Sequence, residues 1–115
     1  MSQSDAINIV RAYLLVLKQA GINIDKAYLY GSYAHDEANI ESDIDLLLVS
    51  SQFDTDDDYV LAKPWLYTNK VDYRIEPLAI DLKRFYSDDT SPIIELVRQT
   101  GIEIKLKLFY GINFP

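Results

Sequence analysis

The chain has 115 residues, of which 49% are hydrophobic and 25% charged. This composition is typical of one globular domain and excludes a disordered chain. The absence of cysteine excludes disulfide frameworks, thiolate zinc sites and cysteine nucleophiles. Apolar runs are too short to span a membrane, and the first residues lack the pattern of a signal peptide. We therefore expect a single domain over residues 1–115, in the cytoplasm.

The net charge of −7 is concentrated in one segment of the chain. Between Ala27 and Ala62 there are nine acidic residues and no lysine or arginine, whereas the remainder is close to neutral. Binding of nucleic-acid phosphates depends on Lys and Arg, so we expect no direct nucleic-acid patch. A phosphate group can still bind in such a segment if cations accompany it.

The first half of the chain predicts alternating helices and strands over residues 4–20, 26–30, 33–37 and 43–49. Apolar residues recur at three- and four-residue steps in the first helix, and Gly21 stands at its end. Ser32 is expected to cap the brief second helix. The second half of the strand at 43–49 is apolar on both faces, which is typical of a central strand.

The second half predicts helix, strand, helix and strand over residues 58–69, 71–80, 91–101 and 102–108. Pro64 breaks the first of these helices, and Ser91-Pro92 is a cap residue followed by a first-turn proline. The last strand alternates between apolar and polar residues, as an antiparallel or edge strand does. Together the eight elements predict an α+β or α/β fold, with helices packed on one small mixed sheet.

Three polar features follow one another along the predicted strands. Gly31-Ser32 ends one strand, Asp43-x-Asp45 opens the next, and Asp72 lies within a third. Residues two apart in a strand point the same way and lie about 7 Å apart, so the two aspartates can close on one cation. Three carboxylates without cysteine favour Mg²⁺ or Mn²⁺ over zinc. The glycine permits close approach of a ligand, and Ser32 can donate to a phosphate.

These strings resemble the signature of the polymerase-beta-like nucleotidyltransferase superfamily. The resemblance lies in GSYAHDEA at residues 31–38, SDIDLLLV at 42–49 and VDYRIEP at 71–77. Within the superfamily, the chain is most similar to the one-domain minimal nucleotidyltransferases of bacteria and archaea. The resemblance covers residues 6–108, and the combination of Gly-Ser with a spaced Asp-x-Asp is more specific than either half.

The resemblance implies a role for each matching residue. Asp43 and Asp45 would bind the metal ions, and Asp72 would be the third metal ligand and catalytic carboxylate. Gly31 and Ser32 would hold the terminal phosphates of a nucleotide, with ATP as the expected substrate. Two more residues would complete the nucleotide site. Arg74 would fix the carboxylates. His35 stands where members commonly carry arginine, because this chain has Ala-His-Asp instead of Ala-Arg-Gly.

Two alternatives remain open at this stage. Glu76 shares a face with Asp72 and competes with it for the place of the third carboxylate, although it could instead pair with Arg74. The resemblance implies transfer of AMP to a hydroxyl, with a helical HEPN-type toxin as the partner and its tyrosine as the acceptor. The alternative is a catalytically weak or inactive antitoxin that neutralises such a partner by binding. Transfer to a small molecule is disfavoured because no acceptor domain is present, and the oligomeric state is left open.

Overall fold

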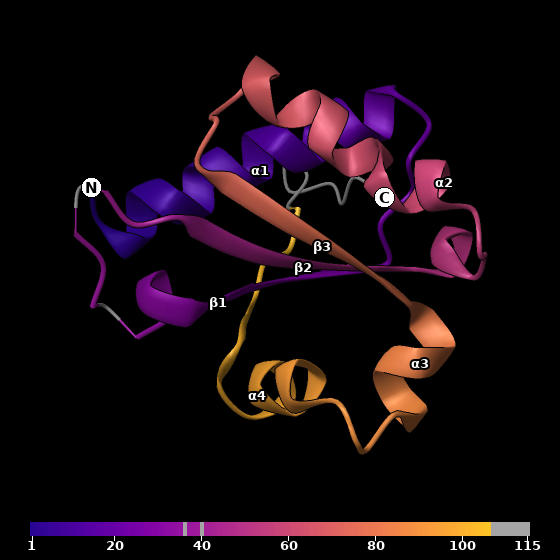
Figure 1. Ribbon diagram of the computed structural model, residues 1–115. Helices are drawn as coiled ribbons and strands as arrows, with labels where there is room; N and C mark the ends of the chain where they lie inside the picture. The colour runs from indigo at the N-terminus through magenta and orange to yellow at the C-terminus, as the bar shows by residue number, and fades with distance from the viewer. Residues whose placement is uncertain (36, 40, 107–115) are drawn as a thin grey trace.

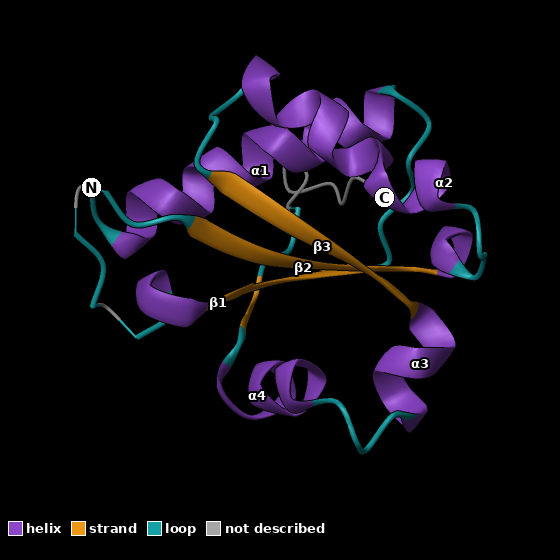
Figure 2. Cartoon of the chain, viewed as in Figure 1, coloured by secondary structure: helices purple, strands orange, loops and turns teal. Residues whose placement is uncertain are grey.

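A four-stranded sheet lies at the centre of the computed structural model, which describes residues 1–35, 37–39 and 41–106 (Figure 1, Figure 2). Helices, 3₁₀ helices (η) and strands follow one another as α1 (Gln3–Gln19), β1 (Lys26–Tyr30), η1 (Gly31–Tyr33), β2 (Ile44–Ser50), η2 (Ser51–Phe53), α2 (Asp58–Ala62), η3 (Lys63–Lys70), β3 (Ile75–Asp81), α3 (Leu82–Ser87), α4 (Pro92–Thr100) and β4 (Ile102–Glu103). Successive strands are thus separated by helical segments.

The sheet is mixed, and β2 lies in its interior. The strand order is β3-β2-β1-β4, with β2 parallel to β3 and antiparallel to β1, while β4 is antiparallel to β1. The prediction of one mixed sheet with the second strand inside it is confirmed. β3 forms one edge and carries Pro77 opposite Leu46 of β2. β4 forms the other edge and is two residues long.

Helices cover both faces of the sheet because β2 is apolar on both sides. Ile44, Leu46 and Leu48 belong to the core beneath α1 and the α2–η3 segment. Leu47 and Val49 belong to a second core with α3 and α4. Figure 1 shows α1 and α2 on one side of the sheet and α3 and α4 on the other. Burial of all five side chains therefore fixes the strand that also carries Asp45.

The helix predicted over residues 4–20 is confirmed as α1. Ser2 and Asp5 form a capping box in which the Asp5 N–H donates to Ser2 Oγ (3.1 Å) and the Ser2 N–H to Asp5 Oδ2 (3.0 Å). Beyond its end, Gly21 has a φ of 84°. The Tyr13 hydroxyl donates to the carbonyl of Pro64 (2.6 Å), which ties α1 to η3.

The broken helix predicted over residues 58–69 is also present. α2 ends at Ala62, and a 3₁₀ helix continues from Lys63 with Pro64 in its first turn. The Asp57 carboxylate accepts the Tyr59 N–H (2.9 Å) and caps α2. None of the helices in the described part of the chain is long and apolar enough to cross a membrane.

The prediction of a helix over residues 33–37 is wrong for the described residues of this range, from which residue 36 is excluded. The chain leaves β1 through the three residues of η1, and no side chain caps this 3₁₀ helix. Its tight turn closes when the Ala34 N–H donates to the Gly31 carbonyl (3.1 Å). A glycine with a φ of 75° begins the turn, so the backbone bends before an α-helix can start.

Predicted strand boundaries near the C-terminal half also differ from the structure. β3 begins at Ile75, four residues later than predicted, because the N–H groups of Val71 and Asp72 donate to the Thr68 carbonyl in a turn. β4 is shorter than the predicted strand over residues 102–108, whose last two residues lie outside the described part. The structure adds α3 directly after β3, a helix that the pattern of residues did not predict.

Candidate carboxylate site

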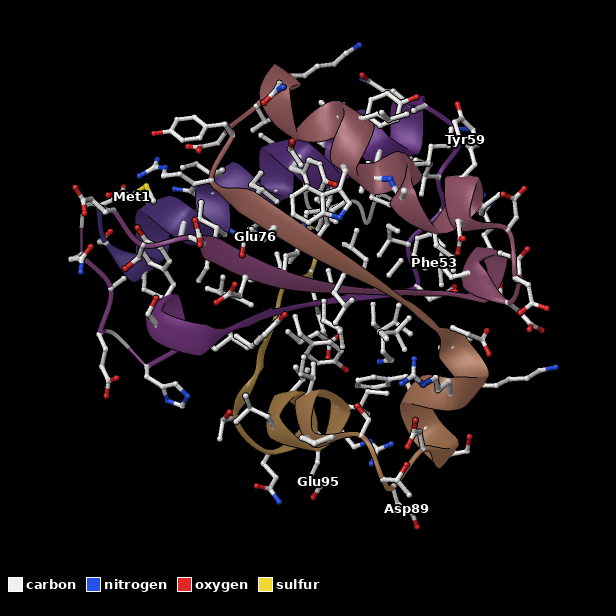
Figure 3. All side chains as sticks on the ribbon, in the orientation of Figure 1. Met1, Phe53, Tyr59, Glu76, Asp89 and Glu95 are labelled. Atoms are coloured by element: carbon white, nitrogen blue, oxygen red, sulfur yellow. The ribbon has the colours of Figure 1, made fainter. Side chains whose placement is uncertain are left out.

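Three side chains form a row across one end of the sheet. Asp45 on β2 lies directly opposite Tyr30 on β1 and Glu76 on β3. Direct partners on neighbouring strands project from the same face, and this face carries α3 and α4 farther along. Figure 3 shows Glu76 near the beginning of β3. We call Tyr30, Asp45 and Glu76 the carboxylate row.

Asp45 is the half-buried acid of this row. Burial, followed by the charges of Glu76 and Asp43 and a hydrogen bond with the Glu76 side chain, raises the pKa of Asp45 to about 6. Burial and then the charges of Asp45 and Glu76 also raise the pKa of Tyr30. Among the described residues, no base forms an ion pair with Asp43, Asp45 or Glu76. Crowded carboxylates of this kind attract a proton or a cation.

Gly31 allows the Asp45 carboxylate to lie against the backbone. Its φ of 75° is in the left-handed region, and a Cβ at this position would collide with Asp45 Oδ2 and lie 3.2 Å from its Cγ. A side chain at residue 31 would therefore displace the carboxylate. From the sequence we expected Gly31 to give room to a phosphate, whereas in the structure it gives room to the Asp45 carboxylate.

The other residues predicted around Gly31 lie at different depths. Asp43 stands one residue before β2 with an exposed side chain, and its charge acts on Asp45. Ser32 is partly buried in η1, which packs against β2. His35 is exposed in the turn after η1, and within the described ranges it forms no hydrogen bond or ion pair with the carboxylate row. The structure thus brings Asp43, Asp45 and Gly31 together, with Ser32 beside them.

Asp72 and Arg74 form a separate pair. Arg74 donates from Nε to Asp72 Oδ1 (3.0 Å) and from Nη2 to Oδ2 (2.7 Å), and its backbone N–H also donates to Oδ1 (2.9 Å). These hydrogen bonds hold the pKa of Asp72 below its ordinary value. The Arg74 carbonyl accepts the Ile44 N–H (2.8 Å). The pair therefore joins the turn before β3 to the start of β2.

The prediction that Asp72 lies on the strand beside Asp45 is wrong. In a continuous strand, Asp72 and Glu76 would project from the same face, because they are four residues apart. β3 begins only at Ile75, so Asp72 lies outside the strand and this alternation does not reach it. The expected pairing is exchanged: Asp72, and not Glu76, binds Arg74, while Glu76 faces Asp45. The role of Asp72 as a metal ligand stays a prediction, and the geometry gives the neighbouring position to Glu76.

The donor atoms of this site match those that Mg²⁺ and Mn²⁺ prefer. Asp43, Asp45 and Glu76 offer carboxylate oxygens without nitrogen or sulfur, and hard divalent cations bind such sets. Across the described residues no three His, Asp or Glu side chains converge as a metal-binding cluster. The structure brings Asp45 and Glu76 together as a pair. Asp43 lies two residues before Asp45 in the chain, just outside β2. The chemistry of the pair fits a divalent cation.

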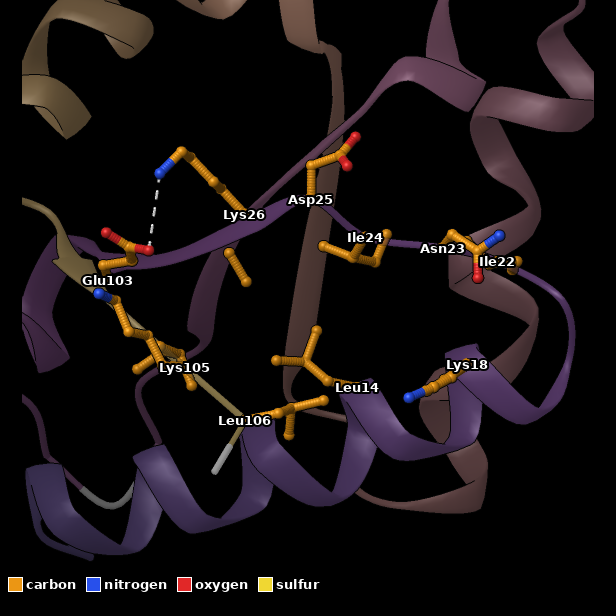
Figure 4. Close-up of a pocket in the computed structure, with 12 residues that line it drawn as sticks. Leu14, Lys18, Ile22, Asn23, Ile24, Asp25, Lys26, Glu103, Lys105 and Leu106 are labelled. Atoms are coloured by element: carbon orange, nitrogen blue, oxygen red, sulfur yellow. Dashed lines mark ion pairs between the residues drawn. The ribbon is translucent and has the colours of Figure 1, made fainter. Parts of the chain in front are cut away.

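A cavity of about 500 Å³ lies elsewhere, between α1, the beginning of β1 and the β4 segment (Figure 4). Leu14, Ile22 and Ile104 form part of its apolar lining. Lys26 and Glu103 lie at its rim and form an ion pair of 3.8 Å. None of the predicted site residues lines it, and Lys26 is at the opposite end of β1 from Tyr30. The cavity is therefore separate from the carboxylate row.

Comparisons with known proteins concern the fold and the family of the chain. A proposed nucleotidyltransferase from Sulfolobus solfataricus has a similar crystal structure, with a TM-score of 0.64 at 13% sequence identity, covering 90% of this chain and 82% of that one. This similarity shows that the two chains share a fold. No curated protein matches the sequence. The family model described as Polymerase beta, Nucleotidyltransferase matches residues 15–107, the greater part of the chain. The chain therefore belongs to the polymerase beta nucleotidyltransferase family.

Proposed function

We propose that this domain transfers a nucleoside monophosphate, AMP from ATP, to a hydroxyl group and uses Mg²⁺ or Mn²⁺. The observation that carries the proposal is the contact between Asp45 and Glu76 on adjacent parallel strands. Asp43, Asp45 and Glu76 would hold the cation, with Glu76 in the place first predicted for Asp72. Bound divalent ions neutralise phosphate charge and lower the pKa of a coordinated hydroxyl.

The remaining residues would bind and orient the nucleotide. Ser32 lies beside the row and has a hydroxyl that can donate to a phosphate oxygen. Gly31 lets the Asp45 carboxylate lie against the backbone, because it has no Cβ there. Arg74 is engaged by Asp72 and, through its carbonyl, by Ile44. We therefore assign Arg74 a supporting part, in which it keeps the start of β3 aligned with β2, instead of direct phosphate binding.

The acceptor hydroxyl is proposed to lie on a partner protein, of the HEPN type that the family resemblance implies. Support comes from the α2–η3 segment, which exposes Tyr59, Trp65 and Leu66 with exposed fractions of 66%, 48% and 60%. Exposed apolar side chains gathered in one segment are typical of a protein interface. The four exposed aspartates just before and at the start of this segment favour a partner with basic residues.

Transfer of label from ATP to the partner tests the proposal. We expect Glu76→Gln to abolish transfer, because it removes a charge on which the cation depends, and Asp72→Asn to leave transfer measurable. Both variants should retain the fold by circular dichroism. Wild type at about 100 times the dissociation constant of Mg²⁺-ATP should gain about 2.7 kcal/mol of apparent stability. Loss of transfer in Asp72→Asn alone, with Glu76→Gln fully active, would return the third ligand to Asp72.

A second candidate function is binding of the partner without catalysis. Two observations favour it: three carboxylates do not converge in the described residues, and His35 stands where the resembled family commonly has arginine. Under this alternative, the wild type would bind and neutralise its partner without label transfer, and Asp45→Asn would neutralise it equally well. Transfer by the wild type would exclude it.

A further inference from the structure

Tyr30 occupies a position that neither the metal ligands nor the phosphate contacts explain. It is the last residue of β1, directly before Gly31 and directly opposite Asp45. Its side chain projects from the same sheet face as Asp45 and Glu76 and is partly buried against the α3–α4 core. The phenol is therefore the third member of the carboxylate row.

The chemistry of this row is asymmetric. Ionised Asp45 and Glu76 can only accept hydrogen bonds, whereas a tyrosine hydroxyl can donate one. Tyr30 and Asp45 are direct partners in the β1–β2 register, and Glu76 is the direct partner of Asp45 on its other side, so the three side chains start next to one another on one face of the sheet. Carboxylates that bind metals are commonly held by hydrogen bonds to a second group, and removal of that group weakens metal binding.

Tyr28 shows what the same residue does one step farther along the strand. On β2 it lies opposite Leu47, and on β4 it lies opposite Glu103, which is not part of the carboxylate row. Its ring stacks on Phe85 with centroids 5.1 Å apart. Its surroundings are thus those of a packing residue. The two tyrosines share a strand and a face but differ in their partner on β2, which is Leu47 for Tyr28 and Asp45 for Tyr30. Tyr28 is therefore a matched control that has no direct partner in the Asp45–Glu76 pair.

We propose that Tyr30 is a positioning residue whose hydroxyl donates a hydrogen bond to the Asp45–Glu76 pair and holds the two carboxylates in a metal-binding orientation. This inference rests on the proposed function, because it presupposes a divalent cation at the pair. It goes beyond that function in assigning a role to a neutral residue outside the ligand set. Cation affinity, and not folding, is what the Tyr30 hydroxyl should control.

Mn²⁺ titration by calorimetry on the purified full chain tests the inference. We expect Tyr30→Phe to weaken Mn²⁺ binding by about 10- to 100-fold and Tyr28→Phe to change it less than twofold. The unfolding temperature of Tyr30→Phe, measured in EDTA, should match that of Tyr28→Phe, which a purely structural role for Tyr30 would not give.

Three results would overturn the inference in distinguishable ways. Equal Mn²⁺ affinity of wild type and Tyr30→Phe contradicts it while leaving the proposed metal site intact. An equal loss of affinity in both tyrosine variants assigns the effect to general packing and contradicts it as well. Absence of Mn²⁺ binding by the wild type overturns the proposed function and this inference with it.

Discussion

Gly31 and Gly21 both have left-handed backbone angles, but only Gly31 lies against a carboxylate of the proposed metal site. The values of φ are 75° and 84°, and a Cβ at Gly21 would have no atom within 4 Å. At Gly31 the Cβ would collide with the carboxylate of Asp45. The two glycines therefore separate the cost of the backbone angle from the cost of displacing a carboxylate.

We expect Gly21→Ala to destabilise the fold by about 1–2 kcal/mol, because an L-residue is disfavoured at positive φ. Gly31→Ala should cost more, because its Cβ would also displace the Asp45 carboxylate. Only Gly31→Ala should also weaken Mn²⁺ binding, since the Asp45 side chain must rotate away. Urea unfolding and Mn²⁺ calorimetry measure the two effects. Unchanged Mn²⁺ affinity in Gly31→Ala would show that the Asp45 carboxylate does not need this backbone contact.

Which residues of the candidate site lie close together could be predicted from the sequence better than which groups they pair with. Asp43, Asp45, Gly31 and Ser32 could be predicted because they lie close together along the chain, and the structure places them together. The choice between Asp72 and Glu76 depended on where β3 begins, which a turn hydrogen-bonded to Thr68 decides. Tyr30 was not singled out, because its relation to Asp45 exists only through the register of two strands.

At the scale of elements, Arg98 joins α3 to α4. Its guanidinium donates from Nε (2.9 Å) and Nη2 (2.6 Å) to the Phe85 carbonyl, and from Nη2 to the Asp88 carbonyl. It also lies over the Phe85 ring, 5.8 Å from the centroid. One cation thus satisfies carbonyls at the end of α3 and fixes the helix that packs Phe85 on the sheet.

Replacement of the Arg98 guanidinium by a lysine ammonium group should weaken the connection between α3 and α4. We expect Arg98→Lys to lower the free energy of unfolding by about 1–3 kcal/mol without changing Mn²⁺ affinity. Arg84→Lys is the control, because the Arg84–Asp88 ion pair is largely exposed on the arginine side and such pairs contribute less than about 1 kcal/mol. Equal losses in the two variants, by urea unfolding, would contradict the assignment.

The elements with strong local signals could be predicted, and those defined by tertiary contacts could not. α1 has its apolar stripe and capping box, α4 begins at Ser91-Pro92, and β2 has a continuous apolar run. α3 is six residues long, with Phe85 as its buried residue, too short for a helical period to be visible. Its position depends on contacts with Arg98 and with the sheet, and such tertiary contacts leave no pattern in the local sequence.

At the scale of the whole molecule, ionisation of Asp45 opposes folding. A folded pKa of about 6, against about 3.9 in an unfolded chain, means that the folded state binds this proton more tightly. Its contribution to stability is therefore present below pH 4 and is lost as the pH rises through 6. Asp72 and Asp88, whose pKa values are lowered, act in the opposite direction, so wild type alone does not isolate the effect.

Asp45→Asn should therefore stabilise the metal-free protein at neutral pH. We expect a gain of about 1 kcal/mol at pH 7.5, a value reduced for the partial exposure of the group, and roughly half as much at pH 5. Urea unfolding in EDTA at both pH values measures it. Asp56→Asn, at an exposed position of the acidic loop, is the control and should show no such pH-dependent gain. A gain that is the same at both pH values would contradict a raised pKa for Asp45.

Pro77 has a consequence for how copies of this protein meet in concentrated solution. An edge strand is a template on which another chain can polymerise through backbone hydrogen bonds, but proline supplies no N–H group for that ladder. β3 thus ends the sheet with an interrupted template. In the described part of the chain the opposite edge offers only the two residues of β4. Growth into ribbons by strand addition is disfavoured at both edges, which leaves side-chain surfaces as the route to assembly.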